Sequence, residues 1–255
     1  MSPLVTIVMP AYNEQGCIEN VVAEWLRVLD RQPGLLCVVN DGSRDRTGEI
    51  LDRLAQSEPR LRVIHQPNSG HGAAVRRGYE EAVRAGTPYV FQTDSDDQFF
   101  AEDFFLLWQH REAAVAYGVR AKRADPIGRK IISRTARLLC WLLFKVWNRD
   151  ANSPFRLFRA ETLRDLLGVV PPGMFAPNIL LLVAARRAGV RVREIEVRHR
   201  ERKTGVVSIL RWKLLQVCLR TAGELLAFRE VLWKKRDELR RMAETAAPEE
   251  IRRRA

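Results

Sequence analysis

The sequence predicts an α/β fold: a doubly wound, Rossmann-like mixed sheet with helices on both faces. Strand and helix patterns alternate four times in the first part of the chain, as in parallel strands joined by right-handed crossovers. The first strands are nearly continuous apolar runs, which is typical of strands covered on both faces. A polar loop follows each strand, at the edge where doubly wound sheets bind ligands. The 255 residues suffice to bury a full core.

The strands of the first half are indicated by apolar and β-branched residues between turn signals. They cover residues 4–9, 35–39, 61–65 and 89–91. An amphipathic helix follows the first strand, with apolar residues from Ile18 to Leu29 on one side. A second helix is expected around Leu51, and a third over residues 73–85. Four polar loops therefore converge on one edge of the sheet.

Basic amphipathic helices are predicted after this core. The later elements are a strand over 115–119, a helix over 131–147, two helices within 159–188, a strand over 190–197 and a helix from residue 207 onward. After Asp237 the chain is charged and short of apolar residues, so its end is predicted to be frayed.

Charge divides the chain into two unequal parts. Its net charge is +12, but residues 1–108 hold 10 Lys/Arg against 16 Asp/Glu, whereas residues 109–255 hold 33 against 15. The basic part favours a phosphate-rich partner such as anionic lipid headgroups or nucleic acid. No aromatic and basic pattern of a nucleic-acid-binding fold is visible, so no nucleic-acid partner is predicted.

The composition also predicts the compartment. No apolar run approaches the ~20 residues that cross a bilayer, and the first residues lack the pattern of a signal peptide. The four cysteines are scattered, which favours reduced thiols in a cytosolic protein, and four dispersed histidines make a zinc site improbable.

An acidic cluster follows the fourth strand. In extended backbone, Asp94, Asp96 and Gln98 would face one point while Asp97 faces away. Carboxylate and amide oxygens suit Mg²⁺ or Mn²⁺, and a bound diphosphate can complete such a shell. Taken alone, the cluster could equally be a solvated acidic turn. The convergence of four polar loops favours the metal site.

Four ordered motifs resemble those of family 2 glycosyltransferases, which have the GT-A fold; they lie at residues 8–14, 38–47, 68–74 and 94–98. Within that family, residues 129–134 and 150–159 resemble the dolichyl-phosphate mannose synthase branch and its bacterial polyprenyl-phosphate relatives. The resemblance implies a catalytic domain over 1–208, followed by a basic amphipathic helical tail over 209–255.

The resemblance also implies roles for individual residues. The nucleotide pocket would be lined by Pro10, Tyr12, Glu14, Val39 and Asp41, with Asp94 and Ser95 against the sugar nucleotide. The metal would be held by Asp96 and Gln98 together with Asp94, and Arg120 and Arg202 would reach the donor phosphates. Three departures are visible: Asn40 replaces the usual first Asp of its motif, Pro154 stands where many relatives have Gly or Ser, and the family's last Lys is missing near Ser208.

Asp150 and Arg156 are the catalytic candidates, since the resemblance implies that this motif lies near the reacting centre. A polyprenyl phosphate is already an anionic nucleophile near neutral pH, so no general base is required. Asp150 would orient Arg156 or the acceptor, and an arginine would offset phosphate repulsion. The implied reaction is an inverting displacement at the anomeric carbon of a GDP- or UDP-sugar, with the polyprenyl phosphate as acceptor.

Two segments could contact a membrane. Residues 128–149 combine an apolar centre containing tryptophan with a basic fringe, which favours a membrane-interface helix over a core helix. For the helix after residue 207, packing on the catalytic domain and binding to a membrane or a partner are equally favoured. We therefore expect a peripheral enzyme on the cytoplasmic face of the membrane, and leave a membrane-protein partner open.

Two other functions stay open at this point. One is a family 2 transferase for a soluble saccharide or a protein hydroxyl, in which Asp150 would act as a base. The other is a basic binding module with a disabled site, against which the complete Asp94, Asp96 and Gln98 pattern argues.

Overall fold

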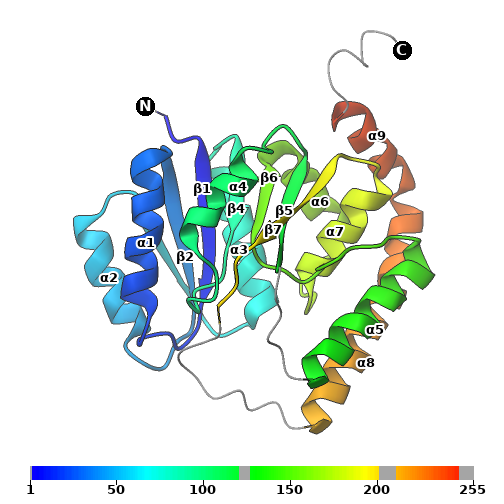
Figure 1. Cartoon of the computed structure of the whole chain (residues 1–255), viewed down its shortest axis with the longest axis horizontal. Helices are drawn as coiled ribbons and strands as arrows, with labels where there is room; N and C mark the ends of the chain where they lie inside the picture. The colour runs from blue at the N-terminus through cyan, green and yellow to red at the C-terminus, as the bar shows by residue number, and fades with distance from the viewer. Residues whose placement is uncertain (1, 121–126, 201–210, 247–255) are drawn as a thin grey trace.

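A seven-stranded sheet forms the centre of the molecule in the computed structural model, which describes residues 2–120, 127–200 and 211–246 (Figure 1). The strand order is β3-β2-β1-β4-β6-β5-β7, and β6 is antiparallel to both of its neighbours while the other pairs are parallel. The strands are β1 (Val5–Ala11), β2 (Gly34–Asp41), β3 (Leu61–Gln66), β4 (Tyr89–Gln92), β5 (Val115–Arg120), β6 (Arg156–Arg159) and β7 (Val192–Val197). The predicted doubly wound α/β fold is confirmed.

Helices cover both faces of this sheet. Those of the first part are α1 (Ile18–Arg31), α2 (Thr47–Ser57), α3 (His71–Arg84) and α4 (Phe104–Trp108), with a 3₁₀ turn, η1, at Ala101–Asp103. Those of the second part are α5 (Ile127–Phe144), α6 (Ala160–Val169), α7 (Pro177–Arg187), α8 (Arg211–Lys234) and α9 (Arg236–Ala246).

The alternation of side chains along β1 supplies two separate cores. Every residue of this strand is buried. Val5, Ile7 and Met9 belong to the cluster that includes the apolar face of α1, whereas Val8 belongs to the cluster that includes α3, α6 and α7. A Cβ on Gly78 of α3 would lie 2.2 Å from a methyl carbon of Val8, so glycine lets this helix approach the sheet closely.

Strand β6 is the strand that the sequence did not predict. It is only four residues long and lies within the motif that was assigned to chemistry. Its pairing partners, β4 and β5, are far away in the sequence, so tertiary contacts decide its conformation. Because β6 is antiparallel, its first residue lies at the carboxyl edge of the parallel strands, and the loop before it reaches the predicted site.

The C-terminal helices α8 and α9 pack against α5, α6 and α7. Helix α8 lies beside α5 and α7, and its Leu225, Phe228 and Leu232 are buried (Figure 1). The prediction of a chain frayed after Asp237 is wrong, because α9 continues to Ala246 and buries Leu239 and Met242. No helix of the described residues has the length and apolar character to cross a membrane.

Candidate active site

A cavity of about 440 Å³ opens where β1, β2 and β4 end. Most of its lining comes from the predicted motifs. The residues around it are Pro10, Ala11, Tyr12, Glu14, Asp41, Asn68, Gly70, His71, Ala74, Asp94, Ser95 and Asp96. Seven of the predicted site residues therefore come together here. The carboxyl ends of parallel strands meet at one edge, which is why motifs far apart in the sequence converge.

Asp41 holds the loop before α3 in place. Its Oδ1 accepts hydrogen bonds from Gln66 Nε2 at 2.7 Å and from the Ser69 amide at 2.9 Å. Its Oδ2 accepts from the Gly70 amide at 2.9 Å. The side chain is only 3% exposed. In this conformation the Asp41 carboxylate shapes the wall of the cavity, and its remaining lone pairs are what a base edge could use.

The loops after β1 and β2 hold each other by reciprocal hydrogen bonds. The Glu14 amide donates to Thr47 Oγ1 at 2.9 Å, and the Arg44 amide donates to Asn13 Oδ1 at 2.8 Å. Asn13 adopts a positive φ of 54°, which turns the chain sharply behind Tyr12. The Tyr12 side chain is left 43% exposed at the cavity, where its ring is available for stacking.

The acidic cluster departs from the extended conformation on which the prediction was based. Strand β4 ends at Gln92, and Asp94, Ser95 and Asp96 all line the cavity. Asp97 has a positive φ of 59°. This turn takes Gln98 away: its side chain is absent from the lining, and its Nε2 donates to a backbone carbonyl at residue 200. Strand alternation therefore does not bring Gln98 to the same point as the two carboxylates.

The side chains of Asp97 and Gln98 bond to Arg200, in the segment after β7. The Arg200 guanidinium pairs with the Asp97 carboxylate and, at 3.3 Å, with Glu24. It also lies 4.7 Å from the centre of the Phe100 ring. Asp97 faces away from the cavity, as the sequence predicted, and fixes the path of the chain toward residue 201.

The donor set fits a hard divalent cation. Asp94 Oδ1 is buried and has no hydrogen-bond partner within the described part of the chain, and His71 Nε2 lies 3.9 Å from it. An uncompensated buried oxygen is costly unless a ligand satisfies it. Among the described residues no group of three or more His, Cys, Asp or Glu could hold a metal. Asp94 and Asp96 would therefore form an incomplete shell, to be finished by substrate oxygens.

Arg120 and Asp150 form a buried pair at the end of β5, and neither residue lines the cavity. Arg120 Nε lies 2.7 Å from Asp150 Oδ2, and Nη2 lies 2.8 Å from Oδ1. The two side chains are 13% and 3% exposed. Arg120 ends β5, which runs parallel to β4 with β6 between them, and it lies three residues beyond Tyr117, the residue level with Gln92 at the end of β4. Arg120 thus makes a bidentate bond to the predicted catalytic carboxylate, and its contact with the donor phosphates stays a prediction.

Arg156 lies below the site and is completely buried. Its guanidinium donates to the carbonyls of Ala151, Ser153 and Asn178, and burial lowers the pKa of Arg156. These bonds tie the loop after Asp150 to α7. Three of its five N–H groups are bonded to backbone oxygens and Arg156 is absent from the cavity lining, so its role at the acceptor phosphate stays a prediction.

Two other predicted residues lie elsewhere. Val39 is completely buried, absent from the cavity lining and close to Gly78, because alternation along β2 turns its side chain toward α3. Arg202 lies outside the described residues. Conversely, His71 and Asn68 line the cavity but were not assigned a role. Both residues belong to the motif at 68–74, so their position at this edge of the sheet could have been predicted from the sequence.

Comparison with known proteins identifies the family. The model of glycosyl transferase family 2 matches residues 6–167. The chain belongs to this family. The match includes all the lining residues of the cavity and the Arg120–Asp150 pair.

The chain is also similar to several characterised relatives. It is 34% identical over 203 residues to glycosyltransferase AglD of Haloferax volcanii, covering 76% of this chain and 32% of the relative. It is 30% identical over 206 residues to a dolichyl-phosphate hexose transferase of the same organism, covering 78% and 83%. It is 28% identical over 211 residues to polyprenol monophosphomannose synthase of Mycolicibacterium smegmatis, covering 78% of each chain. The chain spans about a third of the length of AglD.

Solved structures confirm the GT-A architecture. Glucosyl-3-phosphoglycerate synthase from Mycobacterium tuberculosis, determined with Mn²⁺, UDP and glucosyl-3-phosphoglycerate, aligns with a TM-score of 0.63. The alignment covers 89% of this chain and 80% of that one at 19% identity. At this identity the likeness concerns the fold.

Proposed function

We propose that this family 2 glycosyltransferase moves a sugar from a nucleoside-diphosphate sugar to a polyprenyl phosphate at the cytoplasmic face of a membrane. The observation that supports it most is the cavity at the ends of β1, β2 and β4, which joins an exposed aromatic ring, Asp41 and the Asp94–Asp96 carboxylates. Relatives named for dolichyl-phosphate and polyprenol substrates support the acceptor class.

The donor is expected to lie along this cavity. Tyr12 offers its ring to the base, and Asp41 lies at the end of β2, where the nucleoside would enter. Asp94 and Asp96 would bind Mg²⁺ or Mn²⁺, which supplies charge neutralisation for the diphosphate when it leaves. His71, at the start of α3, is placed to donate to the donor phosphates beside Asp94, whose Oδ1 lies 3.9 Å from the His71 Nε2.

The acceptor is expected to approach from the β5–β6 side. An acceptor phosphate oxygen forms the new bond to the anomeric carbon as the bond to the diphosphate oxygen breaks, which inverts the configuration. A phosphate monoester has a second pKa of about 6, so it needs no proton removed at neutral pH. Asp150 then acts with Arg120 as a positioning pair, and Arg156 fixes the loop that carries Asp150.

A donor panel and a transfer assay test this function. We expect one of the GDP-, UDP- or dTDP-sugars to raise the melting temperature only with Mg²⁺ or Mn²⁺, because a ligand of the folded state stabilises it by mass action. Asp94→Asn should abolish the metal-dependent rise in melting temperature. The control Asp52→Asn, at an exposed position of α2, should retain it.

The acceptor class is tested with the identified donor. A short, water-soluble polyprenyl phosphate should be glycosylated, and free sugars or serine-containing peptides should not. If the free sugars are the better acceptors, a soluble-acceptor transferase replaces the proposal. If no sugar nucleotide stabilises the protein with either metal, the enzymatic reading fails altogether.

A further inference from the structure

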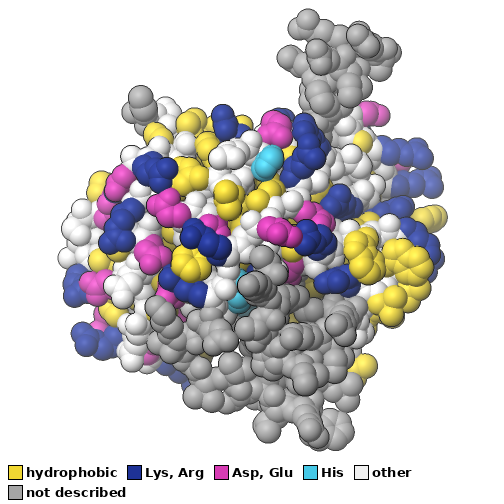
Figure 2. Space-filling view, viewed as in Figure 1, with side chains coloured by type: hydrophobic (Ala, Val, Ile, Leu, Met, Phe, Trp, Pro, Cys, Tyr) yellow, Lys and Arg dark blue, Asp and Glu magenta, His cyan; other side chains and the backbone are white. Residues whose placement is uncertain are grey.

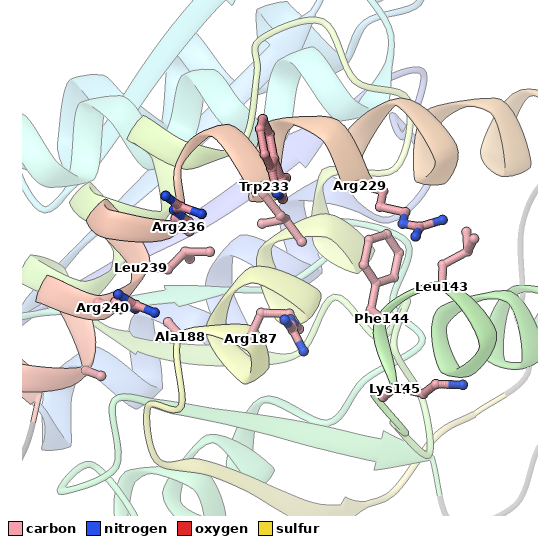
Figure 3. A pocket seen from close by; sticks show the side chains of 12 residues that line it. Leu143, Phe144, Lys145, Arg187, Ala188, Arg229, Trp233, Arg236, Leu239 and Arg240 are labelled. Carbon is pink, nitrogen blue, oxygen red and sulfur yellow. The ribbon is translucent and has the colours of Figure 1, made fainter.

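A second cavity, of about 550 Å³, lies between the ends of α5, α7 and α8 and the start of α9. None of the residues that line it also lines the catalytic cavity. Its lining is Leu143, Phe144, Lys145, Arg187, Ala188, Arg229, Leu232, Trp233, Arg236, Leu239, Arg240 and Ala243 (Figure 3). Four separate elements thus contribute side chains to one hollow.

The polar part of this cavity carries a single sign of charge. Five of the lining side chains are cationic, and no acidic residue lines the cavity among the described residues. Arg187, Arg229 and Arg240 have no carboxylate within ion-pair distance in that part of the chain, whereas Arg236 lies 3.8 Å from the exposed Asp237. In Figure 3, Arg187, Arg236 and Arg240 lie around the space between α7 and α9, and Arg229 and Lys145 lie at its edge beside α5. Like charges that converge without carboxylates favour an anion as ligand.

Exposed apolar side chains of α8 and α5 lie near this cavity, and Trp233 belongs to both. Leu219, Leu226 and Trp233 follow one another at seven-residue intervals on α8, which places them on one side of the helix, and they are 64%, 56% and 70% exposed. On α5, Trp141 and Leu142 are 44% and 50% exposed. In Figure 2, hydrophobic side chains gather beside basic ones at the right of the molecule, where Figure 1 places the end of α5.

The cations also lie against the exposed tryptophans. Lys145 Nζ is 4.8 Å from the centre of the Trp141 ring, and the Arg236 guanidinium carbon is 5.9 Å from that of Trp233. Tryptophan beside Lys or Arg is typical of the region between lipid headgroups and acyl chains. A soluble phosphate compound would account for the cations but not for the exposed leucines; an anionic lipid accounts for both.

We propose that this cationic cavity binds the phosphate headgroup of an anionic phospholipid in the membrane, while the exposed residues of α5 and α8 enter the acyl boundary. The inference rests on the proposed function, because only a membrane-embedded acceptor requires such docking. It adds a lipid site distinct from the acceptor site at the catalytic edge. The bound lipid would hold the enzyme on the bilayer that contains its acceptor.

The test compares two double variants of the full chain. Arg229→Gln with Arg240→Gln removes two cations from the cavity. The matched control, Arg27→Gln with Arg62→Gln, removes two exposed cations from α1 and β3, on the other side of the molecule (Figure 1). Co-sedimentation uses vesicles of phosphatidylcholine alone and with phosphatidylglycerol, at a fixed ionic strength.

We expect the wild type and the control to bind the anionic vesicles and not the neutral ones. The cavity variant should bind about 25-fold more weakly, from about fivefold for each removed charge near an anionic surface. Equal losses in both variants, or no loss in the cavity variant, would overturn the proposal. The proposal would also be overturned if the wild type bound neutral and anionic vesicles equally well and glycerol phosphate at millimolar concentration abolished that binding.

A transfer assay separates this inference from the proposed function. The cavity variant should keep wild-type transfer to a short, water-soluble polyprenyl phosphate and lose transfer to a long acceptor embedded in anionic vesicles. If the wild type glycosylates neither acceptor, the proposed function fails while the vesicle result still decides the lipid site. If the cavity variant also loses transfer to the soluble acceptor, the site is part of the catalytic machinery and the lipid assignment fails.

Discussion

Replacing one member of the Arg120–Asp150 pair should destabilise the protein strongly. Arg120→Leu leaves a carboxylate that is 3% exposed without its bidentate partner. Breaking a buried pair from one side costs about 3–5 kcal/mol, because the remaining charge stays buried. Asp150→Leu leaves the guanidinium instead and should cost a similar amount. For a chain of this size, with an m-value of about 3 kcal/mol/M, the urea midpoint would fall by about 1–2 M.

The double variant separates stability from chemistry. With both charges replaced by leucine, no uncompensated ion remains, so the double variant should recover most of the midpoint that each single variant loses. Sugar transfer should stay low in the double variant, because the Asp150 carboxylate is absent even though the fold is restored. A control, Arg53→Gln, removes an exposed partner of Glu19 and should leave the midpoint unchanged.

Denaturation followed by circular dichroism and a transfer assay on the same preparations measure both effects. Single-variant costs below about 1 kcal/mol, or costs that simply add in the double variant, would refute the buried pair. Full transfer activity in the double variant would refute a functional part for Asp150 and leave the pair as a purely structural contact.

Three further predictions concern the rest of the chain. Gly78→Ala should cost about 1–3 kcal/mol in chemical denaturation, since its Cβ would overlap β1, whereas Gly168→Ala, with open space around it, should be neutral or stabilising. Burial raises the pKa of the Cys140 thiol to about 11, so iodoacetamide at pH 8 should label it only after unfolding, as peptide mapping would show. Although burial opposes it, hydrogen bonds from Thr47 hold the pKa of Asp45 below its usual value. The stability that Asp45→Ala removes should therefore be present at pH 7 and lost as the pH falls below about 4, measured by urea denaturation.

Much of the cavity at the ends of β1, β2 and β4 could be predicted from the sequence. The apolar runs at 4–9 and 35–39 are typical of buried parallel strands, and parallel strands bring the loops that follow them to one edge. Pro10, Tyr12, Asp41 and Asp94 therefore lie around one cavity, as predicted. The order of motifs along the chain was sufficient, because topology converts it into proximity.

The tertiary structure decided what local patterns could not. Strand β6 exists because β4 and β5 both pair with it, and a four-residue run carries no signal of its own. Gln98 left the predicted metal site because the positive φ of Asp97 turns the chain, and alternation holds only in extended backbone.

The partners of charged residues were equally beyond the sequence. Arg120 and Asp150 are 30 positions apart, and only the packing of β5 against the loop before β6 makes them an ion pair. Helix α9 is ordered because Leu239 and Met242 find a core on the other helices, although the segment itself is mostly charged. The sequence by itself determined the α/β fold, the family and the residues of the catalytic edge. The structure alone decided which of them line the cavity and which pair with each other, because burial and pairing depend on neighbours that are distant along the chain.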